Sequence, residues 1–225
     1  MNLRTHYEKI YPKSELAGDI GIYRSLFSID YKHFGVDFLF PNEEIKELVK
    51  WCLDDEFKLY SQVMAVSSPT SKLHQSKWHR EIFYQHLTTS RPLAVQTLVI
   101  LDDFNERTGG TLILPGSHLF ETFPGDEFAS LHQMQPELEP GDVLLLNSFL
   151  YHRSGVNKEL IDRTLITNTF VRPFMDAQFD YTRMVNSDLD DFEREIFSFR
   201  WNSHHTLQEW FDEKTIGTEG PRFLR

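Results

Sequence analysis

The chain has 225 residues, of which 34 are acidic and 23 basic, giving a formal net charge of −11 at pH 7. This length fits one domain with a sizeable core, and the acidic balance argues against a nucleic-acid partner, because such proteins usually carry a clustered basic face. There is no run of 18 apolar residues, so we expect no membrane span. The single cysteine, Cys52, excludes an internal disulfide framework and fits a reducing compartment. The N-terminus lacks an apolar signal core, so a cytoplasmic protein is expected.

The first 56 residues are expected to form a helical and irregular support for the rest of the domain. Residues 1–40 contain many aromatic side chains but no clean period. The next segment is clearer, because Asn42 can cap a helix and two glutamates follow at its positive end. Apolar residues then recur on one face, at Ile45, Leu48, Val49, Cys52 and Leu53. The pattern predicts an amphipathic helix from Asn42 to Asp54 that braces a sheet from outside.

From residue 57 the pattern changes to short strands separated by Gly and Pro turn signals. Strands are predicted at residues 58–66, 93–101, 111–114, 143–146 and 163–171, and residues 78–81 are predicted to be extended. Because no helical pattern intervenes, residues 57–175 are predicted to form an all-β sandwich or barrel.

Residues 176–225 turn polar and helical, with Leu189, Phe192 and Ile196 on one helix face. A second short helix, which Ser203 could cap, is marked by Leu207, Trp210 and Phe211. No linker long enough to separate two domains is present. The whole chain, residues 1–225, is therefore expected to be a single domain.

The stretch Trp78-His79-Arg80-Glu81 carries the strongest chemical signal. Side chains alternate along an extended chain, so His79 and Glu81 point the same way. With one more imidazole, for which His152 is the best candidate, they would form a two-histidine, one-carboxylate site of the kind typical of non-haem Fe(II) oxygenases. Arg163, eleven residues after His152, could hold a cosubstrate carboxylate through two hydrogen bonds.

Further motifs follow in the order typical of one family. They are Leu101-Asp102-Asp103, Thr108-Gly109-Gly110, Pro115-Gly116-Ser117-His118, Gly141-Asp142 and Asn157. Together with residues 78–81, His152, Ser154 and Arg163, they resemble the phytanoyl-CoA dioxygenase family over roughly residues 75–175. The resemblance implies a mainly β protein with a double-stranded β-helix (jelly-roll, cupin-like) core and flanking α-helices. It also implies an oxygenase that uses Fe(II), O₂ and 2-oxoglutarate on a small-molecule substrate.

The resemblance also implies roles for individual residues. His79, Glu81 and His152 would be the metal ligands, and Arg163 and Ser154 would bind the far carboxylate of 2-oxoglutarate. Glu81 stands where the family normally has Asp, but it remains a carboxylate, so the ligand set is kept. Independently of the resemblance, Gln96 lies on a central predicted strand and could face the cosubstrate.

Several alternatives stay open at this point. Asp102 or Asp103 could replace Glu81 as a ligand, and Arg163 could instead pair with Asp162 or Glu159. The same fold could house a metal-dependent cupin enzyme that does not consume 2-oxoglutarate, or a binding module without turnover. The sequence does not give the roles of four further histidines, His74, His86, His204 and His205.

The substrate and the oligomeric state are not readable from the sequence. A metabolite or natural-product intermediate is favoured over an acyl-CoA thioester, because a strongly acidic protein repels the charged nucleotide of CoA. The aromatic N-terminal forty residues and the C-terminal helices are the expected determinants of substrate choice.

Overall fold

A computed structural model of the protein describes residue 9 and residues 21–24, 38–69, 74–82, 86–183, 189–198 and 206–209. The chain folds around two antiparallel sheets. The larger sheet has the strand order β1-β2-β7-β3-β5, and the smaller pairs β4 with β6. The strands are β1 (Ile22–Arg24), β2 (Lys58–Ser67), β3 (Ala94–Ile100), β4 (Thr111–Ile113), β5 (Val143–Asn147), β6 (His152–Ser154) and β7 (Arg163–Val171). Most of the segments expected to choose the substrate lie outside the described residues.

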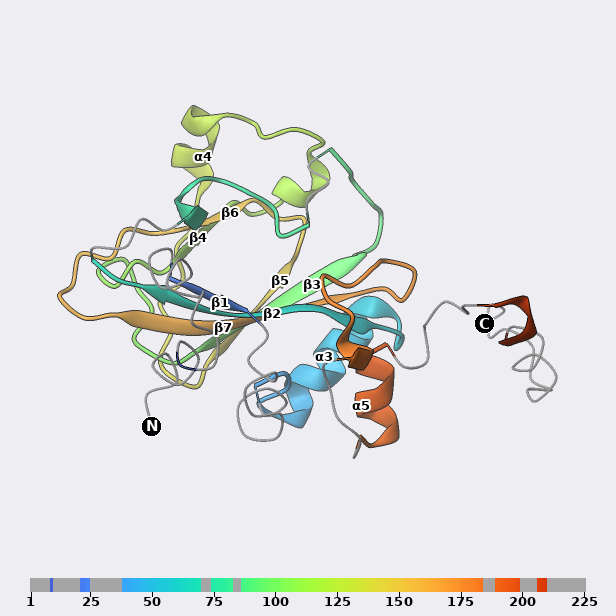
Figure 1. The fold of residues 1–225 in the computed structure, drawn as a ribbon. Helices are drawn as coiled ribbons and strands as arrows, with labels where there is room; N and C mark the ends of the chain where they lie inside the picture. Colours follow the sequence, from blue (N-terminus) through green and yellow to red (C-terminus); the bar gives the residue numbers. More distant parts are fainter. Residues whose placement is uncertain are drawn as a thin grey trace.

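Helices cover the outer side of each sheet (Figure 1). Helix α4 (Asp126–His132) lies over the small sheet, on the side away from the large one, while α3 (Glu43–Leu53) and α5 (Asp191–Ile196) lie under the large sheet. Three single turns of 3₁₀-helix complete the elements, namely η4 (His74–Ser76), η5 (Ser117–Leu119) and η6 (Tyr181–Arg183). The predicted mainly β, jelly-roll architecture with flanking helices is confirmed.

The prediction that no helix interrupts the strands is wrong, because α4 separates β4 from β5. It has seven residues, begins after Gly125 and carries Asp126 and Glu127 in its first turn. A helix of two turns is too short to show a clear apolar period, and Ala129 is its single buried residue. Tertiary packing against the small sheet, more than the local pattern, therefore accounts for it.

Helix α3 forms where the sequence places it, with the predicted cap. The Asn42 side chain accepts a hydrogen bond from the Ile45 backbone N–H at 2.9 Å. Val49 and Leu53 are fully buried, as the predicted face requires. Leu48 was placed on that face but is 40% exposed, so the buried stripe is narrower than the sequence pattern indicates.

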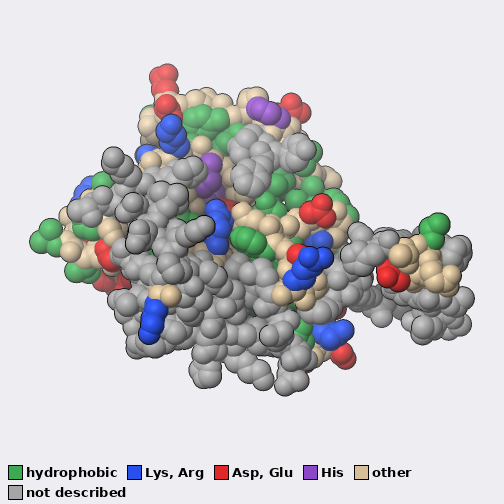
Figure 2. Space-filling view, viewed as in Figure 1, with side chains coloured by type: hydrophobic (Ala, Val, Ile, Leu, Met, Phe, Trp, Pro, Cys, Tyr) green, Lys and Arg blue, Asp and Glu red, His purple; other side chains and the backbone are tan. Residues whose placement is uncertain are grey.

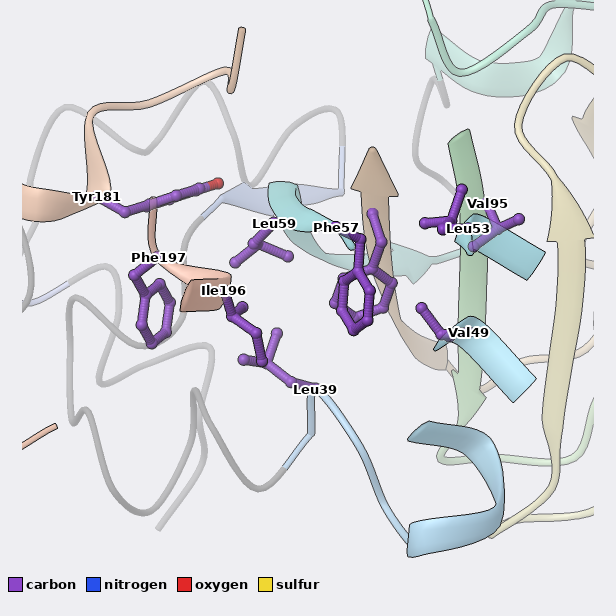
Figure 3. Close-up of a cluster of buried hydrophobic side chains, with 10 residues drawn as sticks. Leu39, Val49, Leu53, Phe57, Leu59, Val95, Tyr181, Ile196 and Phe197 are labelled. Atoms are coloured by element: carbon purple, nitrogen blue, oxygen red, sulfur yellow. The ribbon is translucent and has the colours of Figure 1, made fainter. Parts of the chain in front are cut away.

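Under the large sheet, α3 and α5 share one apolar cluster with the strands above them (Figure 3). Its buried residues are Leu39, Val49, Leu53, Phe57, Leu59, Val95, Phe170, Tyr181, Ile196 and Phe197. The predicted face of α5 is confirmed for Ile196, which is buried, and for Phe192, which packs against the cluster. Leu189 also packs against the cluster but precedes the helix. Each large side chain buried in this way contributes roughly 1.5–3 kcal/mol to folding.

Only part of the second C-terminal helix can be compared with its prediction. Residues 207–209 are helical, and the Thr206 hydroxyl accepts a hydrogen bond of 3.1 Å from the Glu209 N–H. Trp210 and Phe211 lie outside the described residues, as do Ser203, His204 and His205.

A second apolar cluster fills the space between the two sheets. Leu98 of β3, Leu146 of β5 and Leu165 of β7 are buried there, and Ile113 of β4 packs against them. This layer fixes the small sheet over the large one. Polar side chains from both sheets face each other beside it, and they form the site described below.

On the face shown in Figure 2, acidic and basic side chains of the described residues are scattered. No helix in the described ranges is long and apolar enough to cross a membrane.

Candidate metal centre

His79 and His152 lie directly opposite each other on two antiparallel segments. The N–H of His79 donates to the His152 carbonyl, and the N–H of His152 donates to the His79 carbonyl, each at 3.0 Å. Residues paired in this way project their side chains from the same face. The two imidazole centroids are 4.5 Å apart. Backbone pairing thus holds two imidazoles side by side.

Backbone carbonyls also orient each ring. His79 Nδ1 lies 2.8 Å from the Lys77 carbonyl oxygen, and His152 Nδ1 lies 2.9 Å from that of Leu150. A carbonyl can only accept, so these contacts assign the ring proton to Nδ1 and leave the lone pair on Nε2. A second hydrogen bond of this kind is typical of metal-binding histidines. Both rings are therefore arranged to coordinate a metal through Nε2.

Glu81 completes a cluster of three potential ligands. One ligand atom from each of His79, Glu81 and His152 lies within 4.8 Å of the other two, and Glu81 Oε2 is 3.9 Å from His152 Nε2. The segment is less regular than predicted: His79 forms an isolated β-bridge, and Glu81 lies in a bend. The position of Glu81 is fixed instead by a hydrogen bond of 3.1 Å from its backbone N–H to the Ser148 carbonyl.

Burial disfavours charge on both Glu81 and His152. It raises the pKa of Glu81 to about 7, an effect that the positive charge of Arg24 opposes. It lowers the pKa of His152 to about 3, with the neighbouring His79 as a further cause. His152 is therefore neutral at pH 7, and a cation beside Glu81 would compensate the carboxylate charge. Two neutral imidazoles and one carboxylate form a donor set that suits Fe(II), so these residues fit such a metal.

Arg163 is a buried cation that faces the same space. Its side chain is 2% exposed, lies 5.3 Å from the centre of the Phe104 ring, and donates from Nη2 to the Gly109 carbonyl at 2.7 Å. Its Nε has no hydrogen-bond partner among the residues that the structure describes. Burial lowers the pKa of Arg163 to about 10, with nearby Asp102 opposing the shift, so the group stays charged at pH 7.

The acidic partners considered for Arg163 are engaged elsewhere. Glu159 pairs with Arg107 at 2.6 Å, and Asp162 accepts a hydrogen bond from Ser68. Asp102 accepts one from the Thr164 backbone N–H at 2.8 Å and is not part of the three-residue cluster. A buried guanidinium without a carboxylate in contact is suited to bind an anion from outside the chain.

Gly109 holds the carbonyl to which Arg163 donates. Its φ of +74° is in the left-handed region, and a Cβ at this position would lie 2.6 Å from the Asn157 backbone nitrogen. A residue with a side chain does not fit here without moving the backbone. The predicted turn at Thr108-Gly109-Gly110 therefore has a defined purpose, which is to support the buried arginine.

One cavity between the sheets brings together all six residues predicted for the site: His79, Glu81, Gln96, His152, Ser154 and Arg163. Gln96 Nε2 lies 3.4 Å from His152 Nε2. Within the described ranges, Gln96 Oε1 and the Ser67 hydroxyl are buried without a hydrogen-bond partner. Buried polar atoms are normally satisfied, so these atoms, like Arg163 Nε, are suited to a bound ligand.

Sequence reasoning missed several polar residues that line this cavity, among them Thr111 and Ser67. Thr111 lies across from Ser154 in the small sheet, and Ser67 lies across from Arg163 in the large sheet. Their place depends on which strands pair, and the sequence pattern does not reveal this.

Of the four further histidines, His86 has a described side chain, and it is not in the cluster of three. His86 lines a different cleft, and its Nδ1 lies 3.2 Å from the Glu121 carbonyl oxygen. His74 begins η4, but its side chain is outside the description, as are His204 and His205.

The fold and the His-Glu-His cluster define a jelly-roll protein with a candidate two-histidine, one-carboxylate metal centre. A family model described as phytanoyl-CoA dioxygenase (PhyH) matches residues 29–164. This match covers more than half of the chain, which therefore belongs to the phytanoyl-CoA dioxygenase family. The resemblance inferred from the motifs is confirmed.

Relatives of this chain include oxygenases. The uncharacterized protein Rv1501 of Mycobacterium tuberculosis is 26% identical over 174 residues, which cover 75% of this chain and 62% of the relative. The iron/alpha-ketoglutarate-dependent dioxygenase ausU of Aspergillus calidoustus is 31% identical over 90 residues, or 39% of this chain and 29% of the relative. The chain thus spans less than two thirds of the length of either protein.

A solved structure shares the fold. AviO1 from Streptomyces viridochromogenes Tue57 superposes with a TM-score of 0.55 at 19% identity, covering 77% of this chain and 84% of that one.

Proposed function

We propose that the protein is an Fe(II)- and 2-oxoglutarate-dependent oxygenase that hydroxylates or otherwise oxidises a small molecule and releases succinate. One observation carries the proposal: a His-Glu-His cluster and a buried, incompletely paired arginine face the same cavity. Membership of the family and the name of the ausU relative support the cofactor assignment.

In this proposal, His79, Glu81 and His152 hold the iron, the histidines through Nε2. The bound iron, 2-oxoglutarate and O₂ together supply the oxidising chemistry, in which 2-oxoglutarate is decarboxylated and the substrate is oxidised. The chain contributes the geometry. Backbone carbonyls keep both rings in one tautomer, and the apolar layer between the sheets shields one side of the cavity from water.

The cosubstrate is assigned to Arg163, Ser154 and Gln96. The guanidinium of Arg163 would bind the far carboxylate of 2-oxoglutarate, with the Ser154 hydroxyl as a further donor. The Gln96 amide lies beside the His152 ring and would face the other end of the molecule. A fixed, desolvated cation is an effective partner for a dianion, since little water competes for it.

The substrate is proposed to be a small metabolite or natural-product intermediate. The net charge of −11 works against binding of the highly charged CoA nucleotide at long range. Hydroxylation is the expected outcome.

An anaerobic titration tests the proposal. Purified protein is reconstituted with Fe(II), 2-oxoglutarate is added without O₂, and the visible charge-transfer band of the chelate is recorded. We expect a band in the wild type that weakens in Glu81→Ala and in Arg163→Ala. Bound iron without a band would instead indicate a cupin enzyme that does not use 2-oxoglutarate, and absence of iron binding would contradict the ligand assignment.

A further inference from the structure

A second cleft, of about 880 Å³, lies on the outer side of the small sheet, against α4. Trp78 and Arg153 line it, and they are the chain neighbours of His79 and His152. Side chains alternate along paired segments, so these two residues point away from the metal cavity. Figure 1 shows α4 on that outer side, with the large sheet beyond the small one. The cleft and the candidate metal centre therefore occupy opposite faces of the same backbone.

One wall of the cleft is aromatic. The rings of Trp78 and Phe123 are stacked with centroids 6.1 Å apart, and Phe123 meets Tyr151 edge-on at 5.2 Å. Leu114 and Ala129 are buried behind this wall and hold it in place. The arrangement gives a firm apolar surface against which a flat ring can pack.

Two basic side chains in the cleft form no ion pair with an acidic residue that the structure describes. Arg153 lies 5.1 Å from the centre of the Trp78 ring and makes one long hydrogen bond, of 3.4 Å, to Gln133 Oε1. Its Nε is buried without a hydrogen-bond partner in the described part of the chain. Among those residues, neither Arg153 nor Lys77 forms an ion pair, although Asp126 lines the same cleft. In a chain with a net charge of −11, this is a local excess of positive charge.

We propose that this cleft binds a small organic anion that carries an aromatic ring. The anionic group contacts Arg153 and Lys77, and the ring packs against Trp78, Phe123 and Tyr151. Charge-assisted hydrogen bonds to a half-buried guanidinium fix the orientation, while apolar burial supplies most of the affinity. The cleft volume is within the range of about 300–1,000 Å³ that is usual for small-molecule sites.

Calorimetry with a matched pair of probes tests this proposal. 2-Naphthoate and its neutral amide, 2-naphthamide, are titrated into the full chain in the presence of Mn(II) and saturating 2-oxoglutarate, so that the metal cavity is filled. We expect 2-naphthoate to bind, and the amide to bind at least about tenfold more weakly, because it lacks the charge that Arg153 and Lys77 would contact.

Three variants locate the bound probe. Arg153→Gln and Lys77→Gln should each weaken 2-naphthoate binding, and Lys77 is exposed, so its replacement does not endanger the fold. Lys158→Gln removes an exposed positive charge outside the cleft and should leave the affinity for 2-naphthoate unchanged. The proposal is overturned if 2-naphthoate does not bind, if acid and amide bind equally, or if Arg153→Gln weakens 2-naphthoate binding no more than Lys158→Gln does.

Discussion

Two buried arginines near the candidate metal centre are in contrasting environments. Arg80 is 3% exposed and Arg163 is 2% exposed, and each lies over an aromatic ring. Arg80 points to the outer side of the small sheet, where it donates to the backbone carbonyls of Leu87, Ser117 and Phe120. Arg163 donates to one carbonyl, that of Gly109, and faces the cavity between the sheets.

We propose that this contrast separates a structural residue, Arg80, from a ligand-binding residue, Arg163. Removing a guanidinium from water is costly, and hydrogen bonds must compensate for the loss of hydration. For Arg80 the compensation comes from loop carbonyls, so the side chain ties the segment of His79 and Glu81 to residues 117–120. For Arg163 the compensation is incomplete, which leaves capacity for an anion. Under the proposed function, the same residue type maintains the architecture on one face and recognises a ligand on the other.

The largest effect is expected on the inner face, for Glu81→Ala. Because even residues that only orient metal ligands contribute about 10–100-fold to metal affinity, loss of a ligand should weaken Fe(II) or Mn(II) binding by more than about 100-fold. Calorimetric titration of the metal-free protein measures this. Glu81→Asp is the matched control and should retain binding, since it keeps a carboxylate. Unchanged metal affinity in Glu81→Ala would show that the metal, if bound, is held elsewhere.

Arg163→Ala should weaken 2-oxoglutarate binding by about 30-fold or more, the cost of removing one partner of a buried charge pair. The free energy of unfolding should change little, because among the described residues the Arg163 side chain donates one hydrogen bond, to the Gly109 carbonyl. Titration of the Mn(II)-loaded protein with 2-oxoglutarate, together with urea unfolding of the same sample, separates the two effects. Equal cosubstrate affinity in variant and wild type would rule out the assigned role.

Arg80→Ala should have the opposite effects to Arg163→Ala, lowering the stability of the protein and sparing 2-oxoglutarate binding. We expect the free energy of unfolding to fall by about 2 kcal/mol, because backbone carbonyls would lose a charged donor. Cosubstrate affinity of the folded, metal-loaded variant should stay close to that of the wild type. Urea unfolding and the same titration provide both values. A variant as stable as the wild type, or one that specifically loses 2-oxoglutarate binding, would remove the distinction between the two arginines.

The smallest effect is expected at the start of α3, far from both the candidate metal centre and the outer side of the small sheet. Asn42→Ala removes the side chain that accepts from Ile45 N–H and should lower the free energy of unfolding by about 1 kcal/mol. Asn42→Ser retains a capping oxygen and should recover most of the loss. Metal affinity should not change in either variant, since α3 packs under the large sheet.

Local sequence signals predicted much of the fold. Asn42 followed by two glutamates marks the start of α3, and the β-branched run from Arg163 to Val171 coincides with β7. Helix α4 was missed, because its seven residues bury one side chain. The sequence pattern also did not predict how the strands divide into two sheets, because this depends on contacts between residues far apart in the chain.

The candidate site was predictable where the chemistry is specific. His79, Glu81, His152 and Arg163 combine metal-ligating and anion-binding residue types at spacings that rarely occur together, and the structure brings them to one cavity. The outer cleft could not be predicted in this way. Its lining comes from the separate segments around Trp78, Phe123 and Arg153, and no single stretch carries a motif for it.

Crystals of the protein grown with Mn(II) and N-oxalylglycine, an unreactive analogue of 2-oxoglutarate, would show which residues hold the metal and the cosubstrate. An anomalous difference map locates the manganese. We expect one strong peak bound by His79 Nε2, the Glu81 carboxylate and His152 Nε2, with the far carboxylate of the analogue in contact with Arg163. A peak at other residues, or an analogue carboxylate bound away from Arg163, would contradict these assignments.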